Sequence, residues 1–248
     1  MKVLYLGSKK IGYECLQLLL QLQCDKKVTI AGVLTNDNAA FASDIIDLSS
    51  RENILIYKHI DEIINVKDID LLISVQYHQI LKPEHISVAK LAINYHMAPL
   101  PDYRGCNQFS FALYDEAEEF GTTVHRLEAG IDSGAIIDEI RFPIQKGWDV
   151  EDLYNETYVN TIVLFKRSIA NIISGNISFK PQAEFLSKRT SKIIYRKDIS
   201  KLKEISDLDT IPQIARKVRA TCMPGFEPPY FVYNKKKYYV ITEKALKK

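Results

Sequence analysis

Several features that would assign this chain to a familiar class of protein are missing from its sequence. Lysine and arginine total 33 against 31 aspartates and glutamates, so the basic surplus of a non-specific nucleic-acid binder is absent. The four cysteines contain no C-x-x-C pair, which favours reduced thiols over a disulfide framework or a zinc site. No apolar run is long enough to cross a bilayer, and the chain enters its first strand without a signal peptide. We therefore expect a cytoplasmic protein that binds neither nucleic acid nor a membrane.

The usual nucleotide fingerprints are also lacking. Gly7 and Gly12 do not form G-x-G-x-x-G, and Tyr13-Glu14 stand where a P-loop needs Lys and Ser or Thr. This spacing argues against a nicotinamide or ATP site. Lys9, near the start of the following helix, could still contact an anion. A solvated turn without a ligand fits equally well.

What the sequence does contain is an alternation of strands and helices. Apolar runs predict strands at 3–6, 28–34, 54–57, 71–75 and 91–96, with helices at 11–22, 41–51 and 61–65 between them. This order predicts an α/β fold with a mostly parallel sheet flanked by helices. A helix at 107–116, antiparallel strands at 121–127 and 135–142, and a helix at 150–173 capped by Asp149 should follow. Such sheets bind ligands at the carboxyl ends of their strands.

A change in composition near Pro181 predicts two parts, a main domain of residues 1–180 and a small C-terminal region of residues 181–248. The second part should hold a helix at about 209–221 and a β-hairpin with its turn at 234–237. It is too small for a core of its own, so we expect it to pack on the main domain or on a second subunit. Basic residues crowd this region. Most should form a solvated face, and some could meet the phosphates of a substrate.

Polar groups suited to a carbonyl reaction stand at the end of the strand at 91–96. Asn94 and His96 share one face of an extended segment, because strand side chains alternate. Asp132 lies in a second turn, between Gly130 and Gly134. We predict that the amide, the imidazole and the carboxylate converge in one catalytic site. A structural histidine would be the simpler interpretation of His96 alone, and the histidine spacing fits no usual metal site.

Three motifs, in this order, resemble one enzyme family: residues 94–105 (Asn-Tyr-His to Leu-Pro-Asp-Tyr-Arg-Gly), residues 121–125 and residues 130–137. The family is that of the formyltransferases that use 10-formyltetrahydrofolate. The resemblance covers residues 1 to about 180 and implies a Rossmann-like formyltransferase fold with no metal. One departure is Met97-Ala98-Pro99, where the family more often has a small polar residue and leucine after the histidine.

The resemblance implies a role for each polar group. Asn94 would hydrogen-bond the formyl oxygen and stabilise the oxyanion, and His96 would take or relay the proton of the attacking amine. Asp132 would raise the basicity of His96, orient it, or hold a proton-carrying water. For His78, a surface position fits as well as contact with the cofactor. The residues implied to form the folate pocket are Tyr77, His78, Gln79, Ile80, Leu81, Glu128, Gly130 and Ile131.

The acceptor distinguishes the members of this family. The tail is too short for the barrel of methionyl-tRNA formyltransferase and resembles the tail of the sugar-nucleotide N-formyltransferases. That implies an aminodeoxysugar on a nucleoside diphosphate such as dTDP, for surface polysaccharide synthesis, and a homodimer through the C-terminal hairpin. The alternatives are glycinamide ribonucleotide formyltransferase and a folate- or nucleotide-binding module without catalysis. The residues expected to contact the sugar nucleotide are Lys9, Arg104, Tyr195, Arg196, Tyr230 and Phe231, although each aromatic could simply be core.

Overall fold

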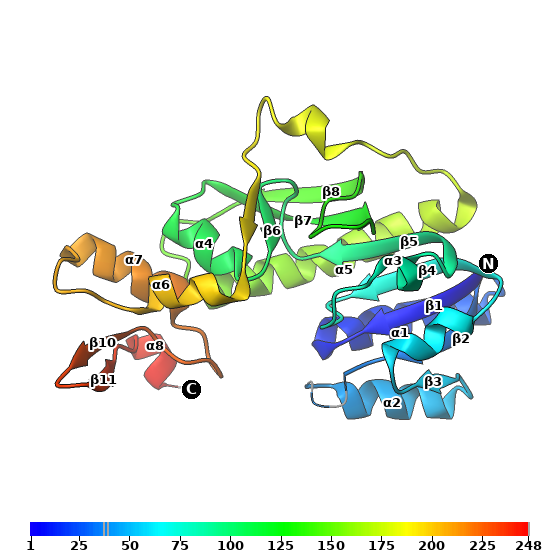
Figure 1. The fold of residues 1–248 in the computed structure, drawn as a ribbon, viewed down its shortest axis with the longest axis horizontal. Coiled ribbons are helices and arrows are strands. Elements are labelled where there is room, and N and C mark those ends of the chain that lie inside the picture. Colours follow the sequence, from blue (N-terminus) through cyan, green and yellow to red (C-terminus); the bar gives the residue numbers. More distant parts are fainter. Residues whose placement is uncertain (37, 39, 248) are drawn as a thin grey trace.

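A computed structural model describes residues 1–36, 38 and 40–247, and Figure 1 draws its ribbon. Seven strands form one sheet in the order β3-β2-β1-β4-β5-β7-β8. The first five strands along the chain pair in parallel. Strand β7 pairs antiparallel with β5 on one side and with β8 on the other. The predicted α/β class with a mostly parallel sheet is confirmed. The strands of the sheet are β1 (Lys2–Gly7), β2 (Thr29–Leu34), β3 (Ile56–Tyr57), β4 (Ile69–Val75), β5 (Ala89–His96), β7 (Glu119–Arg126) and β8 (Ile136–Pro143).

Both faces of the sheet are covered, which explains the unbroken apolar runs of its central strands. Along β1, Tyr5 faces one core and Leu4 faces the other. The first core lies under α1 (Lys9–Cys24), α2 (Ala42–Arg51) and α5 (Val150–Ser174). The second lies under the 3-10 helix η1 (Ile60–Asn65) and α3 (Pro83–Ile86). Asp149 is the N-cap of α5, as predicted, and accepts the backbone N–H of Glu151 and of Asp152 at 3.0 Å.

A third apolar cluster joins the far end of the sheet to the C-terminal region. It contains Tyr103, Phe120 and Ala220. These residues lie on β6 (Tyr103–Gly105), β7 and α7 (Ile211–Thr221), and α4 (Gln108–Tyr114) contributes to the same cluster. The loop after β5 is therefore packed against residues more than a hundred positions away.

The segment after α5 turns back over the main domain. We call residues 180–196 the return strap. It contains the 3-10 helix η2 (Gln182–Phe185) and β9 (Lys192–Ile194). Lys180 bridges to Ile136 of β8, and β9 pairs in parallel with β6. Figure 1 shows this yellow segment running from the end of α5 back to β9. The strap thus lies against both β8 and the chain that follows β5.

The remaining elements are η3 (Arg196–Asp198), α6 (Ile199–Lys203), α7, the hairpin β10 (Tyr230–Tyr233) with β11 (Lys236–Tyr239), and α8 (Glu243–Leu246). The hairpin turn is tighter than the predicted 234–237. Asn234 and Lys235 alone connect the strands, both at positive φ as in two-residue hairpin turns. None of the helices within the described ranges is both long and apolar enough to cross a membrane.

Candidate active site

The end of β5 is held by two buried threonines of the neighbouring strand β7. Thr122 Oγ1 donates to the carbonyl oxygen of His96 at 3.0 Å. Thr123 Oγ1 donates to the carbonyl oxygen of Ala98 at 2.9 Å and accepts the backbone N–H of Leu100 at 3.1 Å. These bonds turn the chain away from the sheet directly after His96. The imidazole is therefore presented from a fixed backbone at the carboxyl end of β5.

His96 is 5% exposed and its ring is held at one nitrogen. Nε2 lies 2.8 Å from the carbonyl oxygen of Tyr103. Because a carbonyl can only accept, the neutral ring carries its proton on Nε2 and a lone pair on Nδ1. Nδ1 lies 3.7 Å from Oδ2 of Asp132. The free nitrogen of His96 thus points towards a carboxylate that can stabilise a proton arriving there.

Asp132 lies in a strained turn between β7 and β8. Its φ is +45°, an uncommon value for a residue with a side chain. Gly134 closes the turn, since a Cβ there would lie 1.9 Å from the carbonyl oxygen of Arg126. Oδ2 of Asp132 accepts the backbone N–H of Gly105 at 2.8 Å. Burial alone would raise the pKa of Asp132, but the positive charge of the His96 and His125 imidazoles, when protonated, and the Gly105 N–H hold it well below its usual range. The side chain is therefore a carboxylate at neutral pH.

His125 joins the three predicted residues into one cluster, although it was not among the residues predicted to be catalytic. It is the register partner of Asn94 across β5 and β7. Its Nε2 lies 3.3 Å from Nδ2 of Asn94 and 3.6 Å from Oδ1 of Asp132. The structure therefore brings Asn94, His96 and Asp132 together, with His125 between the amide and the carboxylate. The signal that could have found it is that His125 ends the second of the three family motifs, at 121–125.

Positive charge gathers beside the carboxyl ends of β1 and β4. Nζ of Lys9 donates to Oε1 of Gln76 at 3.1 Å. Burial lowers the pKa of Lys9 and that of His78, and the positive charge of Arg196 lowers both further. Ser8 is 2% exposed, and its hydroxyl makes no hydrogen bond within the described part of the chain. This arrangement places the Lys9 cation at the start of α1, where an anion is favoured.

The two segments predicted to hold a folate lie on one face of the sheet, and several of their residues are exposed. Tyr77 and Leu81, from the loop after β4, pack into the same cluster as Leu127 and Ala92. Ala92 is two residues before Asn94 on β5 and so shares its face. Ile80 is 82% exposed. The exposed positions of these segments are His78, Gln79, Glu128 and Gly130, while Ile131 is half-buried.

The predicted substrate contacts fall into two groups. Arg104 and Tyr195 lie next to the site: Arg104 Nε donates to the carbonyl oxygen of Ile131 at 2.8 Å, and Tyr195 directly follows β9. Tyr230 and Phe231 lie on the hairpin, which Figure 1 shows at the far end of the molecule from β1. Their rings pack within that hairpin, with Phe231 stacked on Tyr238 at 5.4 Å.

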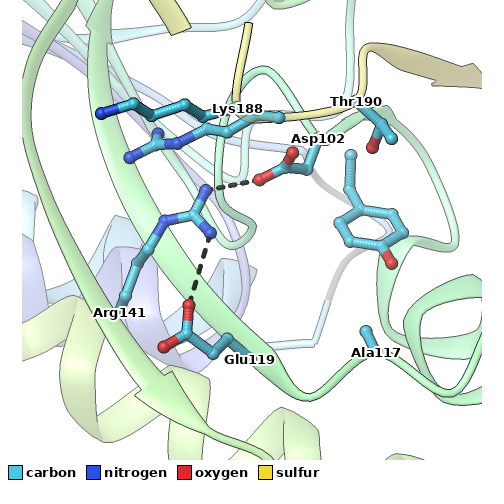
Figure 2. A pocket seen from close by; sticks show the side chains of 8 residues that line it. Asp102, Ala117, Glu119, Arg141, Lys188 and Thr190 are labelled. Carbon is cyan, nitrogen blue, oxygen red and sulfur yellow. Dashed lines mark hydrogen bonds and ion pairs between the residues drawn. The ribbon is translucent and has the colours of Figure 1, made fainter. Parts of the chain in front are cut away.

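A separate surface cavity of about 250 Å³ lies behind the loop that follows His96. Figure 2 shows Arg141 paired with both Asp102 and Glu119, and Lys188 and Thr190 among the other side chains that line the cavity. None of the three predicted catalytic residues lines it. Its ion pairs hold the loop in place. Within residues 1–36, 38 and 40–247, the His, Cys, Asp and Glu side chains form no group of three that could hold a metal ion.

Known proteins resemble this chain in sequence and in fold. The family model described as Formyl transferase matches residues 1–165. The GDP-perosamine N-formyltransferase of Brucella melitensis is 25% identical over 174 residues, 70% of this chain and 64% of that protein. The chain spans less than two thirds of the length of the curated relatives it matches.

Two solved structures superpose on almost the whole chain. WlaRD, a sugar 3N-formyl transferase determined with dTDP and 5-N-formyl-THF, is 27% identical, with a TM-score of 0.77 over 96% of this chain and 84% of that one. The N-formyltransferase from Helicobacter canadensis, in complex with folinic acid and dTDP-3-aminofucose, is 25% identical. Its TM-score is also 0.77, over 96% of this chain and 86% of its own.

Proposed function

This chain belongs to the formyl transferase family, and we propose that it transfers a formyl group from 10-formyltetrahydrofolate to the amine of a nucleotide-linked aminodeoxysugar. The family resemblance read from the motifs is thereby confirmed. The observation that carries the proposal is the cluster of Asn94, His96 and Asp132 at the carboxyl edge of the sheet, in the order and spacing of that family.

Each side chain of the cluster has a task in acyl transfer to an amine. When bound, 10-formyltetrahydrofolate supplies the formyl group. The Asn94 amide offers an N–H to the oxygen on which negative charge develops. His96 takes the amine proton at Nδ1 and later returns it to the departing folate nitrogen. Asp132, 3.7 Å from that Nδ1, stabilises the charged ring in the interval.

The residues around Asn94 suit a folate. Tyr77, Leu81 and Leu127 offer apolar walls on the face of β5 from which Asn94 projects. The exposed Ile80 adds apolar surface that a bound ring would cover. The backbone of Glu128 to Ile131 would supply polar groups to the ring. These residues would hold the pterin and orient the formyl group towards Asn94.

The cations at β1 and β4 suit a nucleoside diphosphate. The positive charge of Arg196 is felt at Lys9, and the buried Ser8 hydroxyl has no hydrogen-bond partner among the described residues. Two charges and a hydroxyl match the pyrophosphate of a sugar nucleotide. The relatives bind dTDP or act on GDP-perosamine, and we favour a dTDP-linked 3-amino- or 4-amino-dideoxysugar, made for surface polysaccharide.

We also propose that the hairpin joins two copies of the chain. Its outer side chains are unusually apolar for a surface: Val232 is 51% exposed and Tyr238 is 45% exposed. Val232→Asp together with Tyr238→Asp should convert a dimer into a monomer in light scattering, and Lys201→Asp on α6 should not. If the parent protein is already monomeric at micromolar concentration, the proposal that the hairpin joins two copies is wrong.

An acceptor screen tests the function. The protein is incubated with 10-formyltetrahydrofolate and, separately, with dTDP-3-amino, dTDP-4-amino and GDP-4-amino sugars and with glycinamide ribonucleotide. Product mass and tetrahydrofolate release are followed. We expect formylation of a dTDP-linked aminosugar. Turnover of glycinamide ribonucleotide alone would mean that the protein is a glycinamide ribonucleotide formyltransferase. Folate binding without turnover of any amine would support a non-catalytic module.

A further inference from the structure

The turn that carries Asp132 receives support from outside the catalytic motifs. Gln182, the first residue of η2 in the return strap, is 50 residues away in sequence from Asp132. Its Nε2 donates to the carbonyl oxygen of Asp132 at 2.7 Å and to that of Gly134 at 2.8 Å. One side-chain amide thus holds two backbone carbonyls of the same turn.

The strap itself is anchored beside this contact. Lys180, two residues before Gln182, exchanges two backbone hydrogen bonds with Ile136, at 2.9 and 2.8 Å. Ile136 opens β8, directly after the turn. The Gln182 side chain therefore extends from a backbone whose distance to the turn is already fixed. Its reach sets where the Asp132 and Gly134 carbonyls lie.

The position of this turn matters because Asp132 adopts a backbone conformation that is costly without support. Its φ of +45° and its bond from Gly105 N–H must both be kept for the carboxylate to face His96. Strained backbone of this kind persists only where the surroundings over-determine it. Gln182 meets that need through the backbone carbonyl, so the Asp132 carboxylate keeps its bond from Gly105 and its place beside His96.

We propose that Gln182 is a positioning residue of the formyl transfer reaction, which holds the Asp132 turn so that its carboxylate faces His96 and the Gly105 amide. This inference rests on the proposed function for its kinetic part only. Glutamine is suited to the task because its NH₂ group has two hydrogens for two carbonyls. Glutamate has the same shape but would set a charged oxygen against both carbonyls.

Two variants and one control test the proposal. Gln182→Glu reverses the interaction, and Gln182→Ala removes it with less risk to folding. Glu184→Ala changes an exposed residue on the same 3-10 turn and serves as the control. Amide exchange is followed by NMR at Gly105, which donates to Asp132, and at Cys106, which donates to the strap residue Ile194 at 2.9 Å.

We expect the amide hydrogen of Gly105 to exchange at least about tenfold faster in both Gln182 variants, because it loses its bond to a charged group. The exchange rate of the Cys106 amide should not change. The kcat should fall by about 10²-fold, the scale of a displaced catalytic group, with little change in KM. Glu184→Ala should match the parent protein.

Unchanged protection of Gly105 in both variants would overturn the proposal. So would equal loss of protection at Gly105 and Cys106 with kcat unchanged, because that pattern describes an anchor for the strap alone. Should the parent protein show no formyl transfer, the proposed function fails, and the exchange of Gly105 still decides whether Gln182 positions the turn.

Discussion

Asn94 and His125 occupy paired positions on antiparallel strands, and Nδ2 of Asn94 lies 3.3 Å from Nε2 of His125. Nδ1 of His125 lies 2.8 Å from the carbonyl oxygen of Arg126. The neutral ring therefore carries its proton on Nδ1 and accepts the Asn94 amide at Nε2. A flipped amide would set two lone pairs against each other. His125 thus fixes the orientation of the Asn94 amide, and with it the end that would face the formyl oxygen in the proposed reaction.

His125→Ala should therefore lower kcat by about 10-fold to 10²-fold, less than the loss of an oxyanion donor itself. The amide of Asn94 would remain but would lose its fixed orientation. Steady-state kinetics with saturating folate measure the effect. His85→Ala is the matched control, because His85 is also buried but pairs with Asp61 at 3.0 Å, on η1. Equal kinetic losses in the two variants would point to a general effect of removing a buried ring.

Replacing the proposed oxyanion donor, Asn94, or the proposed base, His96, should lower kcat further than His125→Ala does. We expect Asn94→Ala to reduce kcat by about 10²- to 10³-fold and His96→Ala by about 10²- to 10⁴-fold. Both side chains act on charge or protons that appear during the reaction, so substrate affinity should change less. Thermal unfolding checks that the fold is intact. Rates like those of the parent protein in either variant would remove that residue from the mechanism.

Features that depend on contacts close in sequence could be predicted, and features that depend on contacts between distant segments could not. The common face of Asn94 and His96 follows from the two-residue period of one strand, which is local. The roles of His125 and Gln182 depend on the register between β5 and β7 and on the path of the strap, neither of which leaves a local pattern. The short β6–β9 pair was missed for the same reason. The hairpin itself was predicted, but the positions of Tyr230 and Phe231 relative to the site depend on how the tail docks.

The low pKa of Asp132 predicts how stability depends on pH. A carboxyl whose pKa is lowered by folding adds stability that is fully present above its unfolded pKa of about 3.9 and is lost as pH falls through the lower folded value. Asp132→Asn should cost ~1–3 kcal/mol at neutral pH, the scale of a hydrogen bond to a charged group. The difference from the parent protein should shrink below about pH 4. Urea unfolding across this range measures it, and a difference that widens in acid contradicts the assignment.

Arg189 of the strap should stabilise the loop after His96. It donates to the carbonyl oxygen of Leu100 at 2.9 Å and to both oxygens of Glu139, at 3.0 and 2.7 Å. A lysine ammonium is a single point and cannot reproduce the planar fork that reaches Leu100 and both oxygens of Glu139. We expect Arg189→Lys to lower the free energy of unfolding by ~1.5–3 kcal/mol, the range for hydrogen bonds to charged groups, and to speed proteolysis of the loop.

The control for that measurement is Lys188→Ala, at the exposed neighbouring position. It should leave both the unfolding free energy and the proteolysis rate unchanged. If Arg189→Lys unfolds at the same urea concentration as the parent protein, the strap does not hold this loop through Arg189.

The proposed pyrophosphate contacts predict a loss of affinity rather than of rate. Lys9→Ala and Arg196→Ala should each raise KM for the sugar nucleotide by about tenfold, which corresponds to ~1.4 kcal/mol per lost ionic contact, with kcat nearly unchanged. Added salt should raise KM less in the variants than in the parent protein, because fewer charges remain to be screened. Lys10→Ala is the matched control, since Lys10 lies next to Lys9 but pairs with Glu14 at 3.7 Å. An equal effect of Lys10→Ala would mean that the general positive field, and not a defined pair of cations, attracts the substrate.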